Sequence, residues 1–348
     1  MSARRVLGLL VAAVLIIAFA IWVSSLRHLE RATLSGDLVL PGLARAVNTV
    51  TTVRLQKAGD THTTLKRQDG GWVVEERAWP ADMSKVRRLL LDLGSLNVVE
   101  EKTRVPANYP QLGVEDLGPK ATGTRVDVTG AARGWSLIVG KSSSAKSGYV
   151  RVLGREQSLL AAPLLAVEAD PKQWLERTLV DLPAERVREI EERPEHAAAF
   201  KVARASKEEA HFSVAPLPKG RELSAPGAAD SLAAALSGLT LDDVRRAGGV
   251  PAASRALFRT FDGLEIEASG RKDGPRSCLT LSARATDPAA QSQAQALNAR
   301  WSGWEFDIPD YKYAAIFSSL EELLKPLPEK KPASGKKPTT AGPPAPTR

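Results

Sequence analysis

The sequence predicts an α+β protein in which antiparallel sheets dominate and a short helix packs on each sheet. Short stretches of alternating polarity, rich in β-branched and aromatic residues, recur between glycine-bearing turns and are typical of strands. Two stretches, 79–96 and 225–239, carry the same signals of a capped amphipathic helix. Helices this short are marginal alone and must pack their apolar stripe on a sheet. We therefore expect two repeated modules, residues 45–179 and residues 180–325.

The first module opens with an expected strand over 50–59. Residues 63–77 are expected to form two strands joined by a turn at Asp69-Gly70-Gly71. Asp82 is expected to cap a helix that Gly94 is placed to end. The helix has an apolar stripe at helical spacing, made of Met83, Val86, Leu89, Leu90 and Leu93. Turn signals then separate expected strands at 96–105, 124–130, 135–141 and 148–154, and a helix at 171–183 closes the module.

The second module repeats this order more loosely. Strands are expected at 199–205 and 211–217, and Asp230 is placed as the next helix cap. The stripe that follows it comprises Leu232, Ala235, Leu236 and Leu239. Four more strands and a terminal helix complete the expected module, at 256–261, 264–270, 278–284, 304–313 and 316–324.

The first 27 residues are predicted to form a membrane anchor. Val6 to Val23 is an apolar run, and no charged residue stands between Arg5 and Arg27. A helix of this length crosses the roughly 30 Å hydrocarbon core of a bilayer. The residues expected to contact lipid include Val6, Leu10, Val14, Ile17, Ile21 and the interfacial Trp22.

A cleaved signal peptide is the alternative, because Ala18-Phe19-Ala20 resembles a small-residue cleavage site. The apolar run continues past Ala20 to Val23, which favours an uncleaved anchor. Both interpretations place the body of the protein on the far side of a membrane. We expect a single-pass protein of the bacterial inner membrane, with a cytoplasmic N-terminus and a periplasmic body. A eukaryotic secreted protein is less favoured, because the sequence contains no Asn-x-Ser/Thr glycosylation site.

Charge and cysteine content exclude several classes of function. The net charge is +8, but six basic residues and one acid lie in Lys325–Arg348, so the body is not a basic nucleic-acid binder. Cys278 is the single cysteine, and the four histidines are not spaced as paired ligands, so we expect no disulfide, metal or cofactor. The tail, residues 326–348, is expected to be disordered, and either touches anionic envelope surfaces or keeps the protein soluble.

No catalytic motif stands out. Gly140-Lys141-Ser142 resembles the end of a P-loop, but Trp135 occupies the position that needs glycine, so a polar turn is favoured. Glu265 and Glu267 share one face of a strand, where a solvated surface is favoured over acid/base chemistry. Asp307 and Asp310 flank an expected turn. We therefore predict that the protein is not an enzyme.

Aromatic residues gather in the segment 301–317. The cluster could form a sugar-stacking platform or a partner interface, where aromatic residues concentrate. The core of a final strand and helix is the favoured alternative, with Trp301 and Tyr311 as the rings expected to be most exposed. The candidate interface residues are Trp301, Trp304, Tyr311 and Tyr313.

The order of motifs in the first module resembles the bacterial family called domain of unknown function 4340. The resemblance is clear over residues 48–180 and weaker beyond. It rests on a W-x-V strand, a capped Leu-rich helix, a Y-x-x-L-G loop, an I-G turn and a Y-V-R strand, carried by Trp72, Val74, Asp82, Tyr109, Leu112, Gly113, Gly140, Tyr149, Val150 and Arg151.

The resemblance implies a single-anchor envelope protein, of a kind that often accompanies gliding-motility-type ABC transporters. No catalytic residues are established for the family, so the resemblance assigns none to this chain. The expected function is that of a non-enzymatic accessory or scaffold subunit of such a system. Its expected partners are membrane lipid, through the N-terminal helix, and ABC permease subunits. An extracytoplasmic binding module for glycan or peptide is the first alternative. A hydrolase is the least favoured one, because neither a nucleophile–base pair nor a metal set is visible.

Overall fold

The computed structural model describes residues 36–130 and 132–326. The predicted anchor and nearly all of the predicted tail lie outside these residues. In the described part, the chain forms mostly antiparallel sheets with few helices, so the α+β class is confirmed.

The chain divides into two compact units. Of the described residues, unit 1 contains those from Gly36 to Leu179 together with Thr240–Gly248 and Trp304–Pro309. Unit 2 contains Val180–Leu239, Gly249–Gly303 and the described residues from Asp310 to Pro326.

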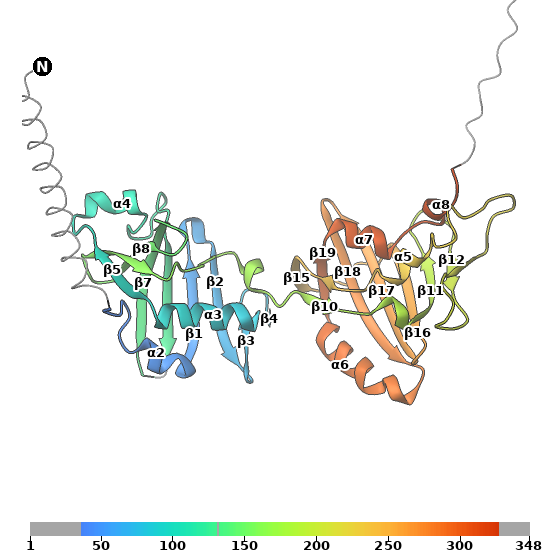
Figure 1. Cartoon of the computed structure of the whole chain (residues 1–348), viewed down its shortest axis with the longest axis horizontal. Helices are drawn as coiled ribbons and strands as arrows, with labels where there is room; N and C mark the ends of the chain where they lie inside the picture. The colour runs from blue at the N-terminus through green and yellow to red at the C-terminus, as the bar shows by residue number, and fades with distance from the viewer. Residues whose placement is uncertain (1–35, 131, 327–348) are drawn as a thin grey trace, which may run out of the picture. The chain divides into compact units, whose positions relative to one another are not determined.

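Unit 1 is built on a nine-stranded antiparallel sheet with the order β4-β3-β2-β1-β6-β7-β8-β9-β5 (Figure 1). Its strands are β1 (Val50–Gln56), β2 (His62–Gln68), β3 (Gly71–Val74), β4 (Trp79–Pro80), β5 (Asn97–Glu101), β6 (Thr124–Gly130), β7 (Gly134–Ser142), β8 (Gly148–Val152) and β9 (Ser158–Ala162). Unit 1 also holds α4 (Tyr109–Leu112) and the antiparallel pair β15 (Asp243–Arg246) and β19 (Trp304–Ile308).

The predicted turn between β2 and β3 is confirmed. Asp69 and Gly70 both have positive φ, 47° and 81°, and Gln68 pairs with Gly71 across the turn. Two successive residues of positive φ form the turn that matches the twist of a two-residue hairpin, and an Asp-Gly pair adopts it most readily.

Asp82 caps α3 (Met83–Gly94) as predicted. Its carboxylate accepts hydrogen bonds from the backbone N–H groups of Ser84 and Lys85. Two donors that have no partner within the helix are thereby satisfied. Burial opposes the charge of Asp82, but the hydrogen bonds from Ser84 and Lys85 outweigh it and lower the pKa of this carboxyl.

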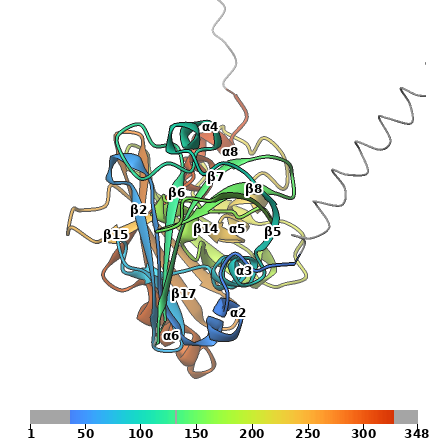
Figure 2. The same ribbon diagram turned by 90° about the vertical axis from the view of Figure 1, so that its left-hand side faces the viewer.

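The predicted stripe of α3 packs into the core of unit 1, except for Met83, which is exposed. The short helix α2 (Leu43–Ala46) packs beside α3, and both lie on the same face of the sheet (Figures 1 and 2). Gly94 is the last residue of α3, and a Cβ there would lie only 3.2 Å from the Cα of Ala44. Gly94 therefore permits the close approach of the two helices.

Unit 2 contains an antiparallel sheet with the order β13-β12-β11-β16-β17-β18 (Figure 1). These strands are β11 (Val187–Arg193), β12 (Phe200–Ala203), β13 (Ser213–Ala215), β16 (Ser254–Thr260), β17 (Leu264–Asp273) and β18 (Arg276–Ala285). The helices of this unit are α5 (Asp230–Ala233), α6 (Gln291–Trp301), α7 (Asp310–Ile316) and α8 (Leu320–Leu323). Two short strands, β10 (Thr178–Val180) and β14 (Leu239–Thr240), lie where the chain passes between units.

Helices α6 and α7 pack against the second sheet. The side-chain amide of Asn298 on α6 hydrogen-bonds both backbone groups of Ala283. Gly270 on β17 lies under the rings of Tyr313 and Phe317, and any Cβ at this position would overlap the Phe317 ring. This face of the sheet therefore holds the core of unit 2.

Two helix predictions were wrong. The helix expected at 171–183 is a single 3-10 turn, Pro171–Trp174, because the backbone beyond it pairs with the segment around Ala81. The second predicted cap, Asp230, is instead the first residue of α5, and its carboxylate binds the backbone N–H of Phe212 and the ring of His211.

Other elements differ in their bounds or were missed. The strand expected over 304–313 ends at Ile308, and α7 begins just after Pro309. The expected terminal helix is split between the end of α7 and α8. Strands β9 and β11 and helix α6 were not predicted. Helix α6 has few large apolar residues and no apolar stripe.

Glu192 on β11 is an exception to the pattern of the second sheet. Its side chain points to the core face, and its cross-strand neighbours are Phe200 and Ala256. The residue is 0% exposed, and neither of its carboxyl oxygens has a hydrogen-bond partner in the described part of the chain. Burial raises the pKa of Glu192 well above its usual value, because an apolar environment favours the protonated form of a carboxyl.

Replacing Asp82 with alanine should lower the free energy of unfolding by about 1 kcal/mol, because two helix donors lose their acceptor. Asp82→Asn is the control, since an asparagine oxygen still accepts these bonds. Urea unfolding measures both variants. Equal stability of the alanine and asparagine variants would contradict the capping role.

Glu192 should make the protein lose stability as pH rises. Because the folded pKa is raised, the contribution of Glu192 to the free energy of unfolding is fully present below the usual glutamate pKa. This contribution is lost as pH rises through the folded pKa. Between the usual glutamate pKa and the folded pKa, the free energy of unfolding of Glu192→Gln should rise relative to that of the parent protein by up to about 1.4 kcal/mol per pH unit. Urea unfolding from pH 5 to pH 8 measures this difference, and parallel profiles would refute it.

Candidate functional site

Five of the motif residues of the first module meet around one loop, residues 104–122: Tyr109, Leu112, Gly113, Gly140 and Arg151. The hydroxyl of Tyr109 donates hydrogen bonds to the backbone carbonyls of Glu156 and Arg104. The guanidinium of Arg151 lies over the ring of Tyr109, 4.7 Å from its centre, and its Nε donates to the carbonyl of Val114 at 2.8 Å. These contacts clamp the loop onto the sheet.

Gly140 and Lys141 complete this clamp. A Cβ at Gly140 would overlap the carbonyl oxygen of Leu112, so the loop can lie against β7 only when glycine is present. The ammonium of Lys141 donates to the carbonyls of Pro110 and Gln111, at 3.3 and 3.1 Å. The turn predicted in place of a P-loop follows at Ser143–Ser147. The motif therefore has a structural role.

The aromatic candidates divide between the two units. Trp304 is buried in unit 1, where it makes an edge contact with Trp79 and lies under Arg246. Trp301 and Tyr313 are buried in unit 2, and Tyr311 is 69% exposed. The six anchor residues from Val6 to Trp22 lie outside the described part of the chain.

The second sheet presents a row of charged side chains on the face opposite its core. Successive side chains of a strand point to opposite faces, so the neighbours of the core residues point the other way. These residues, called here the charged face, are Glu189, Glu191, Arg193, Lys201, Arg255, Leu257, Arg259, Glu265, Glu267, Ser282 and Arg284.

Arg259 lies at the centre of an ion-pair network on this face. It contacts Glu189, Glu191 at 3.5 Å and Glu265 at 3.0 Å. Arg284 approaches the second oxygen of Glu265 at 2.7 Å. Burial opposes the charge on Glu265, but the hydrogen bonds from Arg284 and Arg259 prevail and lower its pKa. Glu265 therefore stays ionised and is unsuited to act as a general acid.

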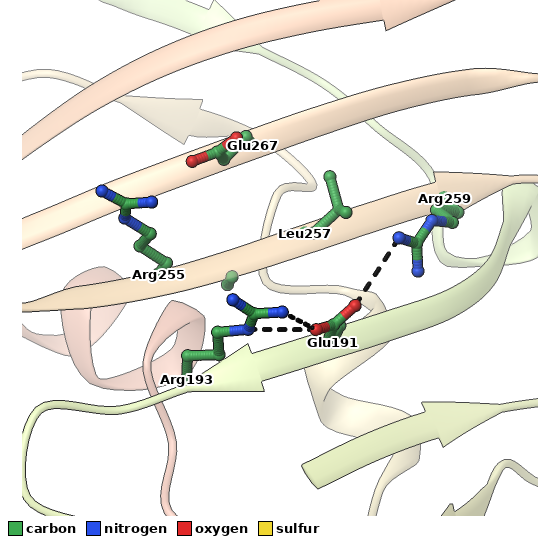
Figure 3. Close-up of a pocket in the computed structure, with 7 residues that line it drawn as sticks. Glu191, Arg193, Arg255, Leu257, Arg259 and Glu267 are labelled. Carbon is green, nitrogen blue, oxygen red and sulfur yellow. Dashed lines mark hydrogen bonds and ion pairs between the residues drawn. The ribbon is translucent and has the colours of Figure 1, made fainter. Parts of the chain in front are cut away.

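A hollow of about 220 Å³ opens beside this network (Figure 3). It is lined by Glu191, Arg193, Arg255, Ala256, Leu257, Arg259 and Glu267, which come from β11, β16 and β17. Arg193 and Arg255 stand directly opposite each other in the register of β11 and β16. Arg193 donates to Glu191 at 3.0 Å, whereas the guanidinium of Arg255 has no ion pair or hydrogen bond among the described residues.

The hollow was only partly visible in the sequence. The pair Glu265 and Glu267 was recognised as lying on one strand face. Arg193 and Arg255 were not singled out, because β11 was not predicted. The alternation of Val187, Glu189, Ile190 and Glu191 was the available signal, but a bulge beside Arg188 interrupts it.

The fold is that of an antiparallel-sheet α+β protein with a charged strand face. The family model described as "Domain of unknown function (DUF4340)" matches residues 48–257, which is more than half of the chain. The chain therefore belongs to this family, and the match continues beyond residue 180, where the resemblance read from the sequence was weak. No curated protein and no solved structure matches the chain.

Two further findings concern the described residues alone. Within residues 36–130 and 132–326, no helix is long and apolar enough to cross a membrane. In the same residues, histidine, cysteine and carboxylate side chains do not gather into a group that could hold a metal ion.

Gly140→Ala should destabilise the protein by about 1–3 kcal/mol, because the added methyl group forces the loop off the sheet. Gly118→Ala is the matched control, since the nearest atom to a Cβ there is 4.0 Å away and its φ is not positive. Thermal and urea unfolding of both variants measure the difference. A Gly140 variant as stable as the Gly118 variant would contradict the clamp.

Proposed function

We propose that this is a non-enzymatic single-pass envelope protein, an accessory or scaffold subunit that binds a partner through the charged face. In this proposal residues 1–27 anchor it in the bacterial inner membrane, with the N-terminus in the cytoplasm. Two related α+β modules and a basic tail lie in the periplasm. The apolar run from Val6 to Val23 supports the anchor.

The charged face is the observation that carries the binding role. Its ion pairs hold long side chains in fixed positions on a rigid sheet, so the face presents a set pattern of charge. Complementary charge of this kind selects partners more than it adds affinity. Within residues 36–130 and 132–326, Arg255 has no ion-pair partner, which leaves one interaction for a partner protein to satisfy.

The proposed partner is the permease of an ABC-type transport system. This part rests on the resemblance to the family, whose members often accompany such transporters. A binding module for peptide is the second candidate function, and the hollow beside Arg255 favours it. The hollow holds no aromatic ring on which a sugar could stack, so a glycan is not proposed as its ligand.

Crosslinking from the charged face tests the proposed function. A photoreactive residue at Ser282, which is exposed on this face, should capture permease subunits in native membranes. The same residue at Gln295, exposed on α6, is the control and should capture far less. Mass spectrometry identifies the products, and a chain lacking residues 1–26 shows whether capture needs the anchor. Equal capture from both positions, or capture without any transporter component, would sink the proposal.

A further inference from the structure

We propose that the hollow binds the C-terminal carboxylate of a peptide between Arg193 and Arg255. This inference rests on the proposed binding role of the charged face, but not on the identity of the transporter partner. The ligand that the hollow selects carries one negative charge, a nearby N–H donor and a small side chain.

The two arginines define the position of the carboxylate. They occupy directly opposite positions of an antiparallel strand pair, where Cβ atoms lie about 5 Å apart and like charges repel. Glu191 relieves part of this repulsion through Arg193, and nothing in the described chain relieves it at Arg255. An anion that bridges both guanidinium groups would remove the repulsion and form charge-assisted hydrogen bonds.

The charges around the hollow favour a single negative charge. Three arginines and two glutamates line it, so the lining carries one net positive charge. One carboxylate neutralises that charge. A phosphate monoester would bring nearly two negative charges between Glu191 and Glu267, and the second charge would be repelled from both sides.

The remaining walls fit the last residue of a peptide. The carboxylate of Glu267 accepts only a 3.4 Å hydrogen bond from Ser269 among the described residues, so it can accept a backbone N–H from the ligand. Leu257, which is half-buried between the two arginines and Arg259, offers apolar contact to a small side chain. A carboxylate, an amide N–H and a small side chain occur together at the C-terminus of a peptide.

Titration of the detergent-solubilised full-length protein with N-acetyl-tri-alanine tests this inference. Calorimetry or ligand-observed NMR should show one saturable site. The C-terminal amide of the same peptide and inorganic phosphate should not compete. Loss of charge-assisted hydrogen bonds should weaken binding by roughly tenfold or more in Arg255→Gln and in Arg193→Gln.

Arg188→Gln is the matched control, because Arg188 is an exposed arginine on the same strand that does not line the hollow. It should bind within about twofold of the parent protein, a difference of less than half a kcal/mol. Since the substituted residues Arg188, Arg193 and Arg255 are all exposed, circular dichroism should show that each variant folds like the parent protein.

Several results would overturn the inference. They are absence of binding, equal binding of the amide, unchanged affinity in Arg255→Gln, or stronger binding of phosphate. Preference for a peptide with an internal glutamate and both ends blocked would also overturn it. If the peptide does not bind but crosslinking from Ser282 still captures permease subunits, the proposed function stands and only this inference fails. If the peptide binds but crosslinking captures no permease subunit, only the proposed function fails.

Discussion

The structure depends on one constraint, which is that every strand in these sheets directs alternate side chains to opposite faces. One row must be covered by packed atoms, and the other row must tolerate water or pair its charges. In unit 1 the helix α3 covers part of the sheet. Asp82 caps its N-terminus, and Gly94 permits its close approach to α2. In unit 2 the cover includes α7, which approaches the sheet over Gly270. The positions of the small residues thus decide how closely the helices lie.

Two neighbouring glutamates on β11 show how strongly this alternation acts. The hydrogen bond from Arg193 lowers the pKa of Glu191, which points to the charged face. Burial raises the pKa of Glu192, which points to the core. The two residues are adjacent in sequence and identical in chemistry. Their opposite protonation behaviour follows entirely from which face of the sheet each side chain occupies.

The family motif and the candidate binding site lie in different units and do different work. Tyr109, Gly140 and Arg151 hold one loop against the sheet of unit 1, through contacts that only those residue types allow. Arg193, Arg255 and Glu267 line a hollow on unit 2. Recognising the family therefore identifies how the first sheet is closed, whereas the chemistry of binding has to be read from the second sheet.

The sequence by itself determined the features that depend on neighbouring residues. The Asp69-Gly70 turn, the Asp82 cap, the stripe of α3 and the family all follow from local residue types and their spacing. Only the tertiary structure decided that Trp174 lies in a 3-10 turn and that Arg193 faces Arg255. These features depend on the register between distant strands, because a strand's own residues do not specify which charge or backbone group will stand opposite them.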